Sequence, residues 1–274
     1  MKNKLLLCAI LISAAILNCS AAEPEVSPYH PWRGLKVAYL GDSITDSGYM
    51  QEVCKYWQWL SKWLGTTPFV YAKAGREWTD LERQANLLQD EHGNDFDAIS
   101  VFVGTNDFMY ATPMGEWFTE TAEKVEFGHK EEKRPVILKK RVLSMDSSTY
   151  KGRINQALAM LKSRYPDKQI VLLTPIHRGG FFANEKNWQP DECFANRIGL
   201  YLSDYVDAVK EASAIWSVPV IDLYSLSGLY PLDDAYADNF KKADTDRLHP
   251  NSAGHYRIAL TLLYQLSSIP GSLK

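Results

Sequence analysis

Short apolar runs alternate along the chain with longer segments in which apolar residues recur every three or four positions. A short apolar run bounded by turn residues is typical of a buried strand, and the wider spacing is typical of a helix with one buried face. Strands alternating with helices form a parallel sheet that helices cover on both faces, so the pattern predicts an α/β fold. The predicted strands are residues 36–40, 68–71, 98–103, 169–174 and 218–223, and the predicted helices are residues 50–64, 80–90, 148–163, 192–216 and 251–266. Gly65 is expected to end the first helix.

One segment, at about residues 108–147, breaks this alternation because it is too long for a plain loop. Its apolar residues are scattered among many charges, and a dense run of charges extends from His129 to Arg141. The simplest interpretation is a hairpin inserted beside the sheet, with the charge run in solvent. The alternative is a lid that shapes a substrate site, because long loops in compact domains often carry function.

The composition is that of one globular domain, which we place at residues 30–270. Of the 274 residues, 46% are hydrophobic and 23% are charged, which is enough apolar material to bury a core. The formal net charge of −3 gives no general attraction to nucleic acid or to an anionic membrane. We therefore expect neither as a partner.

The first 22 residues have the pattern of a secretory signal peptide. Lys2 and Lys4 precede an apolar run at residues 5–17 that is too short to cross a membrane and is followed by small residues. The mature protein is therefore expected outside the cytoplasm. Cleavage after Ala22 would secrete it, whereas Cys19 lies in a loose match to a bacterial lipoprotein site, which would make it a lipid-anchored periplasmic or cell-surface protein.

Two of the four cysteines, Cys8 and Cys19, fall in this leader. The other two, Cys54 and Cys193, are predicted to be buried and to act as small hydrophobes. Export permits a disulfide between them, but their spacing does not decide whether one forms.

The candidate chemistry lies directly after the predicted strands, because ligands of an open parallel sheet bind outside the carboxyl ends of its strands. Gly41-Asp42-Ser43 follows the first strand, Gly75 comes shortly after the second, Gly104-Thr105-Asn106-Asp107 follows the third, and Asp244 to Pro250 precedes the last helix. Each group alone is an ordinary turn or cap. Asp46 and Ser47, for example, are candidate caps of the first helix.

Together these groups supply every part that acyl transfer requires. A serine hydroxyl attacks well only when a base takes its proton, and a histidine does so best when a carboxylate fixes its tautomer. Ser43, His249 and Asp246 can fill these three roles. The backbone N–H groups of Ser43 and Gly75 and the amide of Asn106 can stabilise the oxyanion that forms.

The chain lacks the sequence motifs of other hydrolase and metalloenzyme classes. The chain has no G-x-S-x-G in mid-chain, and its six histidines are scattered without a zinc-binding pattern, so we expect no metal and no cofactor. The alternative from a different class is a carbohydrate-binding or surface-adhesion module without turnover. Its support is a set of aromatic residues in or near the loops around the expected site, Trp32, Trp78, Trp117 and Trp188, although ordinary packing is the preferred explanation for any single one of them.

Three residues are candidate substrate contacts. Trp78 is one, and His177 and Arg178 follow the fourth strand and are expected at the same edge of the sheet. Arg178 has a second interpretation, in which it pairs with a surface carboxylate.

The motifs "GDSIT", Gly75, "GTND" and "DRLHPNSAGH" resemble, in this order, the blocks of the SGNH or GDSL hydrolase family. The resemblance implies a three-layer α/β/α, flavodoxin-like fold with a five-stranded parallel sheet. It also implies that Ser43 is the nucleophile, that Asp246 and His249 complete the triad, and that Ser43, Gly75 and Asn106 form the oxyanion hole. The chain departs from many relatives in having "AKAGREW" without an Asn before Gly75 and a longer insertion after Asn106.

The predicted function is therefore a serine esterase that cleaves small acyl esters through an acyl-serine intermediate. Export and the aromatic residues favour O-acetyl groups on carbohydrate as substrate. A lipase or lysophospholipase is the alternative and would need a long apolar channel. A carbohydrate-binding surface protein without turnover is the second alternative.

Overall fold

The computed structural model describes residues 23–129 and 132–273, so the predicted leader and Cys19 lie outside the described residues. The predicted α/β fold is confirmed: a five-stranded sheet has the order β2-β1-β3-β6-β9, and every neighbouring pair is parallel. Its strands are β1 (Lys36–Gly41), β2 (Thr67–Val70), β3 (Ala98–Phe102), β6 (Gln169–Leu173) and β9 (Val220–Ile221).

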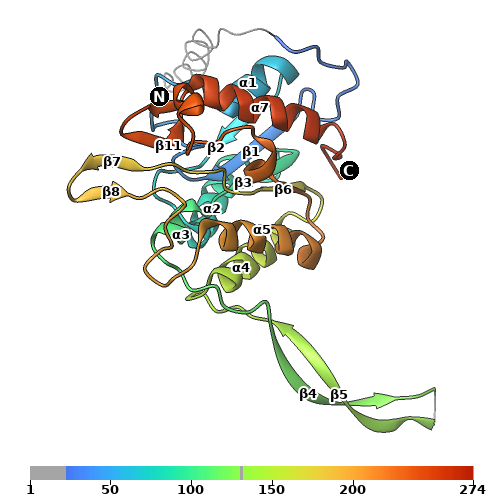
Figure 1. Ribbon diagram of the computed structural model, residues 1–274. Coiled ribbons are helices and arrows are strands. Elements are labelled where there is room, and N and C mark those ends of the chain that lie inside the picture. Colours follow the sequence, from blue (N-terminus) through green and yellow to red (C-terminus); the bar gives the residue numbers. More distant parts are fainter. Residues whose placement is uncertain (1–22, 130–131, 274) are drawn as a thin grey trace, which may run out of the picture.

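Helices cover both faces of this sheet (Figure 1). Successive side chains of a strand point to opposite faces, and β1 shows this directly. Ala38 and Leu40 pack on one side, whereas Val37 and Tyr39 pack on the other. The first side is covered by α2 (Leu81–His92), α4 (Tyr150–Arg164) and α5 (Leu202–Trp216), and the second by α1 (Tyr56–Leu64) and α7 (Ser252–Leu266).

Two of the predicted helices begin later than their apolar spacing suggested. The first starts at Tyr56 rather than at residue 50, where Lys55 is the N-cap residue and the Gln58 side chain accepts the Lys55 backbone N–H at 2.7 Å. It ends at Gly65 as predicted. The helix predicted at residues 192–216 starts at Leu202, because the Asn196 side chain accepts the backbone N–H groups of Ile198 and Leu200 and closes a turn instead.

A second, four-stranded sheet was not predicted. It has the order β10-β11-β7-β8 and is antiparallel throughout. Its strands are three to five residues long and two of its pairings have a register shift, so they are too short for alternation to show in sequence. They are β7 (Phe181–Asn184), β8 (Asn187–Gln189), β10 (Phe240–Lys242) and β11 (Asp246–Pro250).

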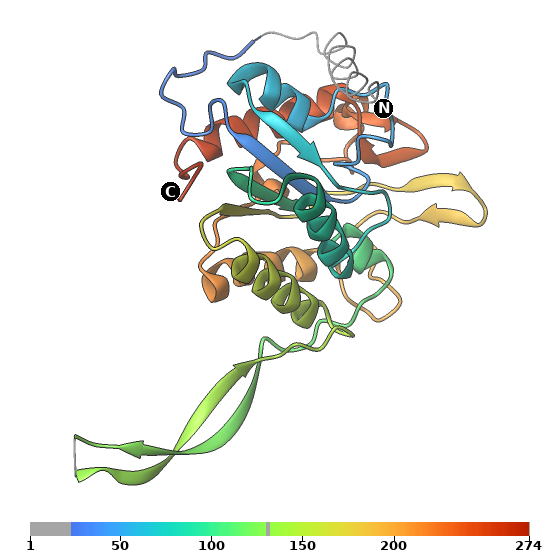
Figure 2. The same cartoon turned by 180° about the vertical axis from the view of Figure 1, so that it is seen from behind.

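The inserted segment forms a hairpin of β4 (Phe118–Phe127) and β5 (Arg134–Leu143), paired over ten positions. It does not lie beside the sheet as predicted, but projects away from the body beyond α4 (Figures 1 and 2). The Asn155 side chain on α4 holds its base by donating to the carbonyls of Trp117 and Ser144. The arm points away from the end of the molecule that carries β11, so in this structure it is not a lid over that end (Figures 1 and 2).

The remaining elements are short and connect the larger ones. A one-turn helix α6 (Leu223–Leu226) follows β9, so the strand predicted at residues 218–223 is shorter than expected. Cys193 is an exposed free thiol and not the buried residue we predicted, so it does not pair with Cys54. Among residues 23–129 and 132–273, no helix is long and apolar enough to span a membrane. The other short elements are α3 (Thr105–Met109) and 3₁₀ helices at Trp78–Asp80 and Asp234–Asn239.

Candidate active site

Ser43 lies in the turn that follows β1, where the strand end is packed tightly. A side chain at Gly41 would come within 2.8 Å of Thr45 Oγ1 and 2.9 Å of the Phe102 carbonyl oxygen, so only glycine fits. The Gln84 side chain binds both backbone groups of Gly41, its N–H at 2.8 Å and its carbonyl at 2.9 Å. The backbone before Ser43 is therefore held rigidly.

Strand β11 brings His249 and Asp246 to Ser43. The Ser43 hydroxyl lies 3.1 Å from His249 Nε2. On the other side of the ring, Nδ1 lies 3.0 Å and 3.1 Å from the two carboxylate oxygens of Asp246. Asp246 also accepts the backbone N–H groups of Leu248 and His249, which fixes its own orientation. The three residues predicted as nucleophile, base and orienting carboxylate thus form one hydrogen-bonded chain.

The loops after β2 and β3 are joined to one another and to the nucleophile turn. Asn106 Nδ2 donates to the Arg76 carbonyl at 2.9 Å, and Asp46 Oδ2 accepts the Ala74 N–H at 2.9 Å. Asp46 therefore fastens the nucleophile turn to the Gly75 loop and does not cap α1, whose cap is Lys55. These bonds bring the loops that carry Ser43, Gly75 and Asn106 together at one edge of the sheet.

This arrangement leaves hydrogen-bond donors for an oxyanion. Gly75 has φ +78°, a left-handed conformation that suits glycine. Among residues 23–129 and 132–273, neither the Ser43 N–H nor the Gly75 N–H has a hydrogen-bond partner. Asn106 uses one of its two amide hydrogens on Arg76, which orients the other.

A buried lysine beside the nucleophile was missed in the sequence. Lys55 is 2% exposed, and its Nζ lies 3.5 Å from the Ser43 carbonyl oxygen. Burial lowers the pKa of this ammonium to about 8, against the opposing effect of the Asp46 and Asp42 carboxylates. We did not predict a role for Lys55 because the sequence pattern placed it inside a helix at residues 50–64. In the structure it is the N-cap residue of α1.

Asp42 is also buried next to Ser43. Burial raises the pKa of its carboxyl to about 7, and the hydrogen bond from the Ile44 N–H, at 3.0 Å, partly offsets this effect. Two aromatic rings flank the candidate base: those of Tyr49 and Phe181 lie 5.0 Å and 5.5 Å from the ring of His249. No pattern in the sequence predicted that Tyr49 or Phe181 would contact His249, because only the fold brings them together.

The predicted substrate contacts need correction. Trp78 is 2% exposed and packs in the core, where its indole N–H donates to the Tyr150 hydroxyl. Arg178 is 1% exposed, so it does not reach a substrate surface, and its guanidinium bonds to Gln189 and Thr105. Trp78 is buried because it packs in the core cluster that contains residues of α2 and α4.

His177 pairs with a carboxylate, which is the interpretation we had raised for its neighbour Arg178. Its Nδ1 lies 2.5 Å from Glu192 Oε1, and its ring lies 3.7 Å from that of Tyr224. Of the four tryptophans expected near the site, Trp32, Trp78 and Trp117 are buried, and only Trp188 is exposed.

The fold is that of the SGNH class of hydrolases. The model of the GDSL-like Lipase/Acylhydrolase family matches residues 39–257, and the chain belongs to that family. No curated protein matches the chain.

Solved structures with the same fold are similar over most of the chain. A protein from Lactobacillus plantarum is 25% identical with a TM-score of 0.66, covering 86% of this chain and 98% of its own. A possible lipase from Chitinophaga pinensis is 21% identical with a TM-score of 0.62, covering 88% and 100%. A catalytic mutant of an acetylxylan esterase from Geobacillus stearothermophilus is 21% identical with a TM-score of 0.51, covering 85% and 94%.

Proposed function

We propose that the protein is an exported serine esterase that removes small acyl groups, above all O-acetyl groups on carbohydrate, through an acyl-serine intermediate. The observation that carries the proposal is the hydrogen-bonded chain from Ser43 through His249 to Asp246. Family membership supports an ester-cleaving hydrolase. The acetyl and carbohydrate assignments are our own extension.

The first half of the reaction transfers the acyl group to the enzyme. His249 Nε2 takes the proton of the Ser43 hydroxyl as Oγ attacks the ester carbonyl carbon. The Asp246 carboxylate keeps the proton on Nδ1, so that Nε2 is free to accept, and it stabilises the imidazolium. The imidazolium then protonates the departing alcohol, and the acyl-serine remains.

The second half repeats these steps with water. His249 takes a proton from water, the hydroxide attacks the acyl carbon, and Ser43 leaves with the proton that His249 returns. In both halves the tetrahedral oxyanion would be stabilised by the N–H groups of Ser43 and Gly75 and by the amide of Asn106. Each such donor typically contributes about 2.7–4 kcal/mol to the transition state.

A small void lies beside the nucleophile turn. It is lined by residues that include Asp42, Ile44, Arg178 and Leu248, and its volume of about 10 Å³ is about enough for one water molecule. Neither Ser43 nor His249 lines it, so it is not an acyl-binding site. The preference for a short acyl group is our extension, and a lipase would need a long apolar channel next to Ser43.

The decisive experiment measures hydrolysis of p-nitrophenyl esters of increasing chain length, together with acetate release from acetylated oligosaccharides. We expect the rate to be highest for acetyl and acetate to be released from the sugars. Ser43→Ala should abolish turnover and acyl-enzyme formation, whereas Ser47→Ala, at an exposed serine four residues later, should not.

Other outcomes would contradict specific parts of the proposal. Rates that rise with chain length would favour the lipase, and turnover by Ser43→Ala would remove the nucleophile assignment. A protein that binds sugars but cleaves no ester would be the carbohydrate-binding surface protein. For export, the proposal predicts that the mature chain is found outside the cytoplasm without residues 1–18, and that palmitate labelling depends on Cys19 if the protein is lipid-anchored.

A further inference from the structure

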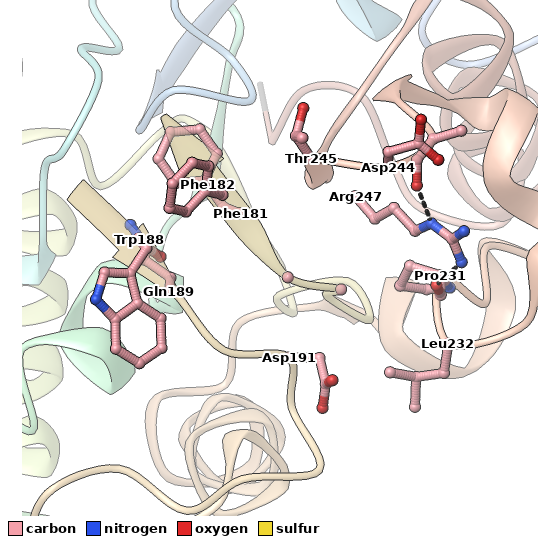
Figure 3. A pocket seen from close by; sticks show the side chains of 13 residues that line it. Phe181, Phe182, Trp188, Gln189, Asp191, Pro231, Leu232, Asp244, Thr245 and Arg247 are labelled. Atoms are coloured by element: carbon pink, nitrogen blue, oxygen red, sulfur yellow. Dashed lines mark hydrogen bonds between the residues drawn. The ribbon is translucent and has the colours of Figure 1, made fainter. Parts of the chain in front are cut away.

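A hollow of the molecule lies outside the arrangement of Ser43, His249 and Asp246. It has a volume of about 510 Å³, within the range of small-molecule sites. It is bordered by the β7–β8 hairpin, by the residues before β11 and by the segment at Pro231 (Figure 3). We call it the hairpin cavity.

One side of the hairpin cavity is aromatic. Phe182 on β7 and Trp188 on β8 are direct cross-strand partners, so their side chains project from the same face of the hairpin. They are 52% and 57% exposed, which is unusual for rings of this size. Such a surface offers flat apolar area to the C–H face of a sugar ring.

The other sides carry polar groups that are not used within the protein. Among residues 23–129 and 132–273, the Asp244 carboxylate and the Thr245 hydroxyl have no recorded hydrogen-bond partner, although both residues line the cavity. Gln189 pairs with Phe181, so its side chain projects from the opposite face of the hairpin, where it accepts from Arg178. The Asp244 carboxylate can accept, and the Thr245 hydroxyl can both donate and accept, so the cavity offers both kinds of group.

The charges in the hairpin cavity narrow the class of ligand. Arg247 lines it, but its guanidinium is already bound to Asp234 and to the carbonyls of Pro231 and Ala243. The other charged residues that line it are Asp191 and Asp244, and neither forms an ion pair within residues 23–129 and 132–273. They disfavour an anionic ligand, and the polar groups disfavour an acyl chain, so a neutral ligand with several hydroxyl groups fits best.

The hairpin cavity lies across the small sheet from the candidate base. Phe181 pairs with Asp246, and its ring lies 5.5 Å from the ring of His249 in an edge-on arrangement. The next residues along the two strands, Phe182 and Arg247, project from the opposite face and line the cavity. A polymer bound in the cavity would therefore reach Ser43 around the edge of this sheet.

From these observations we infer that the hairpin cavity is a subsite for neutral carbohydrate, which stacks on Trp188 and Phe182 and hydrogen-bonds to Asp244 and Thr245. The inference takes the reaction, ester cleavage, from the proposed function. The carbohydrate site in the hairpin cavity is an addition to that function. It predicts that the enzyme distinguishes polymeric from simple acetyl esters through the hairpin.

The first test compares two substrates in matched variants. Trp188→Ala and Phe182→Ala should each lower kcat/KM for acetylated xylo-oligosaccharides about tenfold relative to p-nitrophenyl acetate, mainly through KM, because loss of one aromatic contact weakens binding by roughly that factor. Phe127→Ala removes an aromatic ring of similar exposure at the tip of the projecting hairpin, so it should leave the ratio unchanged. An unchanged ratio in Trp188→Ala would overturn the inference.

The second test does not depend on turnover. Deacetylated xylo- and manno-oligosaccharides of four to six units are titrated calorimetrically into the Ser43→Ala protein and into Ser43→Ala combined with Trp188→Ala. Binding that requires Trp188 supports the subsite, even if the protein cleaves no ester and the proposed function fails. Absence of binding, or binding of choline chloride in place of any sugar, would overturn the subsite and leave the esterase assignment standing.

Discussion

Replacing Asp246 by Asn should nearly abolish activity while preserving the fold. The Asp246 carboxylate accepts from His249 Nδ1 on both oxygens and from the backbone N–H groups of Leu248 and His249. An asparagine oxygen in the Oδ1 position keeps the backbone donors, and its NH₂ group then takes the Oδ2 position, 3.1 Å from His249 Nδ1. An N–H donor at that distance favours Nδ1 as the acceptor, so that the proton moves to Nε2.

The size of the effect follows from this change of tautomer. With a proton on Nε2, His249 cannot take the proton of the Ser43 hydroxyl, which lies 3.1 Å away. The same tautomer error in a serine protease triad lowers kcat by about 10⁴-fold, or ~5.4 kcal/mol of transition-state stabilisation. We expect a loss of this order for Asp246→Asn.

The assay is steady-state hydrolysis of p-nitrophenyl acetate, with thermal unfolding as the check on folding. Asp238→Asn is the matched control, because Asp238 is exposed eight residues upstream and its carboxylate forms no hydrogen bond or ion pair within residues 23–129 and 132–273. A well-folded Asp246→Asn enzyme that loses less than tenfold would refute the reasoning. The orienting group would then have to be something other than this carboxylate.

Four further predictions concern the oxyanion site, a buried ion pair, the pH dependence of stability and the projecting hairpin. Asn106→Ala should lower kcat by about 10²–10³-fold with little change in KM, and a near-normal kcat would exclude its amide from the oxyanion site. Arg153→Met should lower the unfolding free energy in urea by about 3–5 kcal/mol, because it leaves the fully buried Asp107 carboxylate without its 2.9 Å partner; a loss below 1 kcal/mol would contradict this. Burial raises the pKa of Asp42 to about 7, so the folded state binds its proton more tightly than the unfolded state. The unfolding free energy should therefore fall as pH rises from about 4 to 7, and urea titrations should show a shallower fall in Asp42→Asn. Replacing residues 120–141 by a short Gly-Ser turn should leave both the melting temperature and p-nitrophenyl acetate hydrolysis unchanged, whereas a large loss of activity would revive the lid hypothesis.

The sequence alone was enough to predict the strands of the main sheet and the candidate catalytic residues at their carboxyl ends. Strands such as 98–103 are buried on both faces and therefore read as continuous apolar runs, and their carboxyl ends must meet at one edge. This reasoning was enough to select Ser43, Gly75, Asn106, Asp246 and His249 as a group. The structure then joined them by hydrogen bonds, directly for Ser43, His249 and Asp246 and through the connected loops for the other two.

Tertiary structure alone decided which of the remaining side chains are buried and which are open. Trp78 and Trp188 look equivalent in the sequence, yet one lies in the core and the other lines the hairpin cavity. Lys55 was taken for an ordinary helix residue, although packing buries its ammonium against the Ser43 carbonyl. The physical reason is that local spacing fixes which face of an element a side chain occupies, whereas its burial and partners depend on segments far away in the chain, such as the short strands β7 and β11.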